Sequence, residues 1–191
     1  MAKVKKNVVM NGLSGMLADQ VVVKQDKAGR TIITVKPTFR DDREFSEAQQ
    51  EQIEAFREAA QYAKVAAKTE AIYAEKAEDT PRSGYNIAIA DWFHEPEVDE
   101  IDLSGWTGQA GQSIRIKALD DVKVERVTVL ITDEADVLIE QGAAVQEDGL
   151  WWVYTTTQAA SGQPKVMAVA RDLPGNVAQL VAQLAKALEA V

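Results

Sequence analysis

The sequence predicts an α+β protein: an N-terminal β-hairpin plus helical pair, then an antiparallel β-sandwich and a C-terminal amphipathic helix. Two observations predict this class. Apolar residues recur with helical spacing before about residue 97 and alternate with a period of two after it. Turn residues then separate short strands roughly every 8–12 residues, with no helical crossover between them. The predicted domains are a hairpin and two-helix module (1–97), a sandwich (98–175) and a terminal helix (176–191), with a linker around Pro96.

The hairpin is predicted from two β-branched runs, residues 21–24 and 31–35. Turn-forming residues lie between the runs, and Gly29 among them can adopt a positive φ. Pro37 ends the second strand. The order of strand, turn and strand is typical of a β-hairpin.

The first helix is predicted to begin after Ser46, which has Gln49 three residues on, the spacing of a capping box. Neither Gly nor Pro occurs from there to about residue 77, so we expect one long helix. One seam of this helix has the spacing of a packed helix pair. Its residues are Ile53, Phe56, Ala60, Ala63 and Ala67. The seam either packs on the next helix of the same chain or joins two copies of the protein.

The second helix is predicted over residues 81–93, with Thr80 as its cap and Pro81 in its first turn. One apolar stripe follows the helical period and predicts a core face against the long helix. The residues of this stripe are Tyr85, Ala88, Ile89, Trp92 and Phe93.

The sandwich is predicted from alternating segments whose turns are marked by glycine and aspartate. The segments are 113–118, 127–131, 137–140, 150–156 and 165–170. A terminal helix is predicted over about 176–190, with an apolar stripe that includes Leu180, Leu184 and Leu188. This stripe either packs on its own chain or binds a second subunit.

The C-terminal part resembles a bacterial immunoglobulin-like or fibronectin-type domain over about residues 98–176. The resemblance rests on the segments 152–154 and 166–172, and on an A-x-D-x-x-G-N stretch made by Ala170, Asp172, Gly175 and Asn176. It implies an immunoglobulin-like β-sandwich, although the cysteine pair of true immunoglobulin domains is absent. The N-terminal part resembles uncharacterised bacterial families in which a small hairpin precedes a helix that starts as residues 46–49 do. Neither resemblance brings a catalytic motif.

Composition excludes many functions. The chain has no cysteine and one histidine, His94, which argues against thiolate, zinc-thiolate and histidine-based chemistry. It carries 30 acidic against 21 basic residues, a net charge of −9, so we expect no nucleic-acid partner. No apolar run is long enough for a bilayer, which predicts no membrane partner and a cytoplasmic protein.

Two kinds of ligand site remain open. Carboxylates in predicted loops are candidate calcium ligands: Asp120, Asp121, Asp133 and Asp136. Trp106, Trp151 and Trp152 are candidates for a sugar-stacking surface, although one of the two adjacent tryptophans is expected in the core. The sequence predicts a non-catalytic structural or protein-interaction protein without a cofactor, which self-associates through its N-terminal module. The alternative is a ligand-binding sandwich for carbohydrate or calcium.

Overall fold

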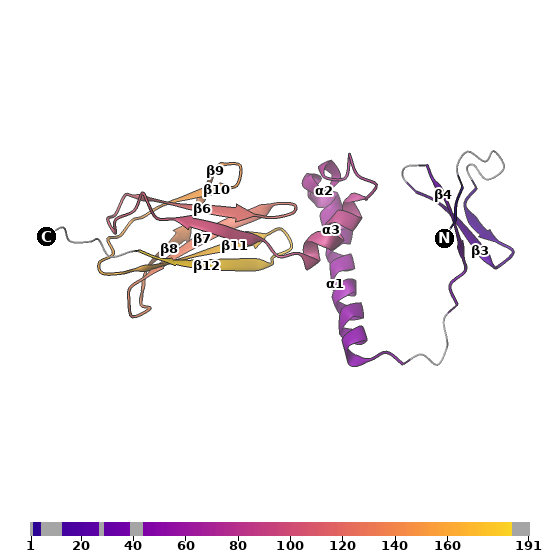
Figure 1. Cartoon of the computed structure of the whole chain (residues 1–191), viewed down its shortest axis with the longest axis horizontal. Coiled ribbons are helices and arrows are strands. Elements are labelled where there is room, and N and C mark those ends of the chain that lie inside the picture. The colour runs from indigo at the N-terminus through magenta and orange to yellow at the C-terminus, as the bar shows by residue number, and fades with distance from the viewer. Residues whose placement is uncertain (1, 5–12, 27–28, 39–43, 185–191) are drawn as a thin grey trace. The chain divides into compact units, whose positions relative to one another are not determined.

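The computed structural model describes residues 2–4, 13–26, 29–38 and 44–184. The chain divides into two compact units, residues 1–89 and 90–191. The first unit holds a small sheet and most of the helical residues, and the second holds the end of the last helix and the sandwich (Figure 1).

The small sheet is built around the predicted hairpin, which is confirmed: β3 (Val21–Gln25) pairs antiparallel with β4 (Thr31–Val35). Two strands that were not predicted, β1 (Ala2–Val4) and β2 (Gly15–Leu17), complete the sheet order β1-β4-β3-β2. Because a two-stranded hairpin alone is marginal in water, the additional strands supply backbone partners that the pair needs.

Helix α1 (Glu47–Thr69) begins with the predicted capping box: Ser46 accepts from the Gln49 amide, and the Gln49 side chain accepts from the Ser46 amide. The helix was predicted to continue to about residue 77, which is wrong. Glu70 adopts extended backbone angles, and a separate short helix, α2 (Ala71–Glu75), follows it. The break allows the Tyr73 hydroxyl to lie 2.6 Å from that of Tyr62, with the two rings edge to face. This packing overrides the local helix propensity.

Helix α3 (Gly84–Phe93) starts three residues later than predicted. The hydroxyl of Ser83, and not that of Thr80, accepts a hydrogen bond from a first-turn amide, that of Asn86 at 3.2 Å. Gly84 packs so close to α2 that a Cβ there would lie 3.1 Å from the Tyr73 carbonyl oxygen. Of the predicted apolar stripe, Ala88 is fully buried, whereas Tyr85 and Phe93 are exposed.

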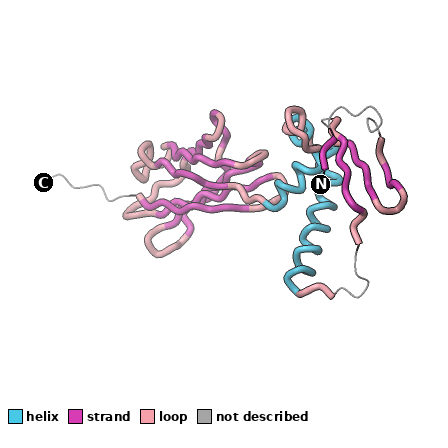
Figure 2. The backbone as a smooth tube through the Cα atoms, turned by 45° about the vertical axis from the view of Figure 1, so that its right-hand side comes forward, coloured by secondary structure: helices cyan, strands magenta, loops and turns pink. Residues whose placement is uncertain are grey.

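The second unit is a β-sandwich of two four-stranded antiparallel sheets (Figure 2). One sheet has the order β5-β6-β10-β9, in which the strands are Glu97–Asp102, Ser113–Leu119, Trp151–Thr155 and Val145–Asp148. The other has the order β12-β11-β7-β8, in which they are Val177–Gln183, Lys165–Asp172, Val124–Thr132 and Leu138–Ala143. Alternate residues of the two sheets fill one core, which includes Ile114, Ile116, Val127, Val129, Ile131, Val166 and Ala168.

Two predictions in this unit are wrong. The predicted linker at 94–100 contains the start of β5, whose alternation is hidden by a bulge between Val98 and Glu100. The predicted terminal helix is wrong over 177–183, because these residues form β12, and every residue of β12 pairs with β11. Residues 185–191, with Leu188, lie outside the described residues.

Candidate functional site

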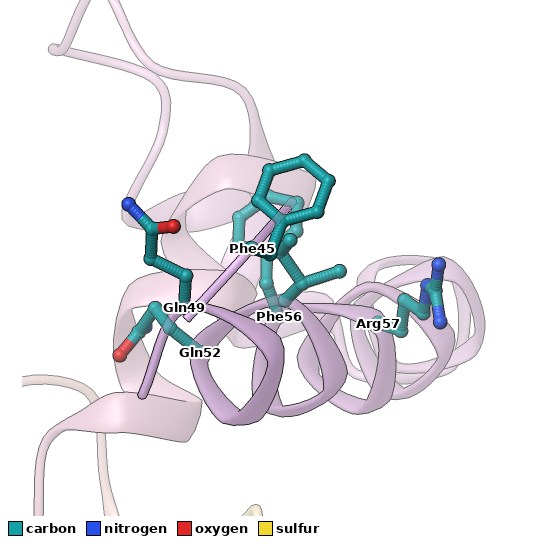
Figure 3. A pocket seen from close by; sticks show the side chains of 6 residues that line it. Phe45, Gln49, Gln52, Phe56 and Arg57 are labelled. Carbon is teal, nitrogen blue, oxygen red and sulfur yellow. The ribbon is translucent and has the colours of Figure 1, made fainter. Parts of the chain in front are cut away.

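A groove runs along the first turns of α1, and it contains two residues of the predicted seam. Ile53 and Phe56 line it together with Phe45, Gln49, Gln52 and Arg57, around a volume of about 460 Å³. Figure 3 shows the rings of Phe45 and Phe56 close together, with the two glutamines on one side and Arg57 on the other. The groove is therefore apolar at its centre and polar at its rim.

The groove exists because α1 buries only its second half. The buried residues of this helix are Ala59, Ala63 and Ala66, and none of the residues from 47 to 58 is buried. Phe45 and Phe56 keep 42% and 51% of their surface exposed, which is high for phenylalanine. The predicted seam is thus divided between a packed half and an open half.

The other seam residues lie in the packed half. Ala63 is fully buried, and Ala60 and Ala67 on the same helix are half-buried. The C-terminal candidates occupy another environment: Leu180 and Leu184 are half-buried and pack against the sandwich core. Of the predicted interface residues that the structure describes, Ile53 and Phe56 alone line this open groove.

A second hollow, of about 670 Å³, lies in the sandwich unit between the end of α3 and the β6–β7 turn. Its lining includes His94, Glu95, Glu97, Asp120 and Asp121. His94 Nδ1 lies 2.6 Å from Asp121 Oδ2, and both side chains are exposed. Asp120 Oδ2 accepts hydrogen bonds from the amides of Val122 and Lys123, at 2.8 and 2.6 Å, and so holds the turn.

The four calcium candidates do not converge. Asp120 and Asp121 precede β7 and Asp133 and Asp136 follow it, so that nine strand residues separate the pairs, a length of about 30 Å. Asp133 accepts from two amides of its own turn, and Asp136 pairs with Lys165 at 2.6 Å. Among the residues that the structure describes, no group of three or more acidic or histidine side chains is arranged to hold a metal ion.

The three tryptophans do not share a surface. Trp106 and Trp152 are buried in the sandwich core, whereas Trp151 is half-buried and faces outward from β10. This separation matches the expectation that one of the adjacent pair belongs to the core. The guanidinium of Arg115 covers the Trp151 ring at 4.6 Å from its centroid, so this ring face is already in contact.

The A-x-D-x-x-G-N stretch forms an anchor for the C-terminal end of α3. Asp172 is fully buried and accepts from the Gly175 amide and from Asn176 Nδ2, each at 2.8 Å. Asn176 Nδ2 also lies 3.2–3.3 Å from the carbonyl oxygens of Asp91, Trp92 and His94. Carbonyls at a helix end have no partner within the helix, and the asparagine supplies one. The sequence showed the motif but not this role.

Burial raises the pKa of Asp172 above its ordinary value of 3.8, although hydrogen bonds from Asn176 and Gly175 oppose the shift. The folded state therefore binds the proton of the Asp172 carboxyl more tightly than the unfolded chain does. Protonation of Asp172 stabilises the folded state fully below pH 3.8, and this stabilisation is lost as pH rises through the folded-state pKa. We therefore expect the free energy of unfolding of the wild type, relative to Asp172→Asn, to fall over this window. Urea unfolding at a series of pH values measures the difference; a rise with pH would contradict the prediction.

Comparison with known proteins identifies no family. No family model matches the chain, and no curated protein matches its sequence. Solved structures match about half of it. CopC from Methylosinus trichosporium OB3b is 12% identical over 47% of this chain and 90% of its own, with a TM-score of 0.37. A tetra-tandem repeat of a large adhesion protein is 22% identical over 47% of this chain and 22% of its own, with a TM-score of 0.33.

A conjugative transposon lipoprotein from Bacteroides eggerthii is 11% identical over 48% of this chain and 96% of its own, with a TM-score of 0.28. All of these TM-scores lie below 0.5, so the description of the sandwich rests on its own strand order and core. In the part of the chain that the structure describes, no helix combines the length and apolar character needed to cross a bilayer.

Proposed function

We propose that this protein is a non-catalytic interaction protein that self-associates through its N-terminal unit, with the groove on α1 as the contact surface. The observation that carries the proposal is the open half of α1. Phe56 on α1 and Phe45 just before it line one groove and are exposed, and the helix buries no residue before Ala59. Aromatic residues in a shallow apolar groove are typical anchors of protein interfaces.

The placement of the potentially reactive side chains supports a non-catalytic role. The single histidine is exposed and paired with Asp121 on the surface. The buried carboxylates Glu140 and Asp172 accept hydrogen bonds from neighbouring loop amides, which is a structural use of the charge. The hollow beside His94 is open, and the carboxylates of Glu95, Glu97 and Asp121 in its lining are exposed.

The strand order supports an immunoglobulin-like type for the sandwich. If the eight strands from β5 to β12 are named A, B, C, C′, D, E, F and G in chain order, the sheets read A-B-E-D and G-F-C-C′. This arrangement combines the ABED sheet of constant domains with a GFC sheet that is extended by one strand. Such a sandwich is a stable scaffold without intrinsic chemistry, in keeping with an interaction protein.

The decisive variant is Phe56→Glu, which places a charge at the centre of the groove. We expect the wild type to form concentration-dependent oligomers and Phe56→Glu to raise their dissociation constant about 30-fold or more, since loss of an aromatic anchor typically costs about 2 kcal/mol or more. Sedimentation velocity over a concentration series measures the change.

Val65→Glu is the matched control, because Val65 is 61% exposed on the same helix and does not line the groove. It should leave the dissociation constant unchanged. A monomeric wild type at every concentration, or a Phe56→Glu variant that associates like the wild type, would contradict the proposal.

A further inference from the structure

The outward face of the sheet β12-β11-β7-β8 carries an apolar row across three strands. Met167 of β11 lies directly opposite Leu130 of β7 on one side and Val181 of β12 on the other. Directly opposed residues point to the same face of a sheet, so the three side chains are neighbours. Val181 is 50% exposed, and the other two are half-buried. This row is the centre of what we call the cationic face.

The cationic face takes its charge from two opposed arginines. Arg171 of β11 lies directly opposite Arg126 of β7, and both are exposed. Like charges in this position repel, which costs stability unless an anion offsets them. Neither arginine forms an ion pair with the described residues of the chain. Of the residues paired in register on this face none is acidic; Glu125 lies at the adjacent bulge.

The outward face of the other sheet, β5-β6-β10-β9, has the opposite character, and we call it the acidic face. Its only cations on the paired strands are already neutralised, Lys117 by Asp99 at 2.7 Å and Arg115 by Glu147 at 3.3 Å. Further carboxylates remain without a described ion pair: Glu97, Glu100, Asp102 and Asp148. Trp151 and Val153 lie at the centre of this face.

We propose that the cationic face of one copy of this protein docks on the acidic face of a second copy. The two faces are complementary, since each has an apolar centre and they carry charge of opposite sign. Two copies with a net charge of −9 each repel one another in general. Their charges favour approach when the cationic face of one copy points at the acidic face of the other. This contact is independent of the groove on α1.

The contact joins two different surfaces, so it does not close on a pair. After docking, one copy still offers an unused cationic face and the other an unused acidic face, so further copies can add to both. The expected product is therefore an open series of copies, whose mean mass rises with concentration without a plateau at the dimer. Higher salt concentration should weaken this association, because the attraction acts between solvent-exposed charges that ions screen.

The test uses the full chain in the Phe56→Glu background, which removes association through α1. We expect this protein to associate at low salt, and Arg126→Glu with Arg171→Glu to raise the dissociation constant at least roughly tenfold. Lys24→Glu with Lys64→Glu makes the same change in net charge at exposed positions of the first unit, which belong to neither face, and should have little effect. Sedimentation velocity and circular dichroism report association and folding.

A second variant identifies the occupant. Glu97→Arg with Glu100→Arg reverses the acidic face, so it should not associate alone, yet should associate one-to-one with the Arg126→Glu, Arg171→Glu protein. Restored association in that mixture supports the proposal. The proposal is overturned if the Phe56→Glu protein is monomeric, or if the double arginine variant associates as strongly as the Phe56→Glu protein. It is also overturned if the mixture stays monomeric, which would indicate that the cationic face binds a different anionic partner. All of these measurements use the Phe56→Glu background, so none of their outcomes bears on the proposed contact through α1.

Discussion

Trp106→Ala is expected to lower the free energy of unfolding by about 3–5 kcal/mol, the usual cost of deleting a fully buried tryptophan. Trp106 lies in the loop between β5 and β6, is 1% exposed and belongs to the sandwich core. Removal of the indole leaves a cavity at one end of two packed sheets, which rigid strands cannot fill. Urea unfolding monitored by far-ultraviolet circular dichroism measures the loss.

Trp106→Phe separates packing from hydrogen bonding at this position. The indole Nε1 is buried and has no hydrogen-bond partner among the described residues. Phenylalanine keeps much of the ring volume and removes this unsatisfied donor, whose burial costs about 1–3 kcal/mol. We expect the Phe variant to lose less than half as much stability as the Ala variant. Trp151→Ala, at a half-buried ring, is the control for tryptophan loss at the surface.

Elements whose signal is local could be predicted from the sequence. The β3–β4 hairpin, the capping box at Ser46 and strands such as β6 and β7 follow from short patterns. β5 could not be predicted, because its bulge places Val98 and Ile101 three residues apart and breaks the alternation. A bulge is visible only when the partner strand is known.

The error at β12 has a different cause. The segment 177–184 repeats Val-Ala-Gln-Leu twice, and its apolar residues fit a helical stripe as well as they fit alternation. The structure chooses the strand because β11 offers seven consecutive partners, from Lys165 to Arg171. Local pattern cannot decide between two periods when a neighbouring strand supplies the stabilisation.

The candidate surfaces could likewise be predicted only where their signal is local in the sequence. The helical spacing predicted that Ile53 and Phe56 share one face of α1. It could not predict that the buried part of this helix begins only at Ala59. The pairing of Arg126 with Arg171 depends on the register of β7 and β11, whose segments lie about 40 residues apart in the chain. The buried position of Glu140 was also hidden, since its partners are the amides of Thr157 and Gln158 in a distant loop.

Gly108→Ala is expected to lower the free energy of unfolding by about 3 kcal/mol or more, because it combines backbone strain with a steric clash. Gly108 has a φ of +88°, a region that costs other residues about 1–2 kcal/mol. A Cβ there would also lie 2.5 Å from the carbonyl oxygen of Ala160, while the Gly108 oxygen accepts from the Ala160 amide at 2.8 Å. The clash is with backbone, so the hydrogen-bonded contact between the two loops must open.

Gly111→Ala is the matched control in the same loop. Gly111 has a φ of +82°, but a Cβ there would meet no atom within 4 Å. This variant should therefore lose only the cost of the backbone conformation, about 1–2 kcal/mol. The difference between the two unfolding free energies isolates the close approach of Gly108 to Ala160. Equal losses in the two variants would show that the loops separate at little cost, and that this end of the sandwich is not held by their contact.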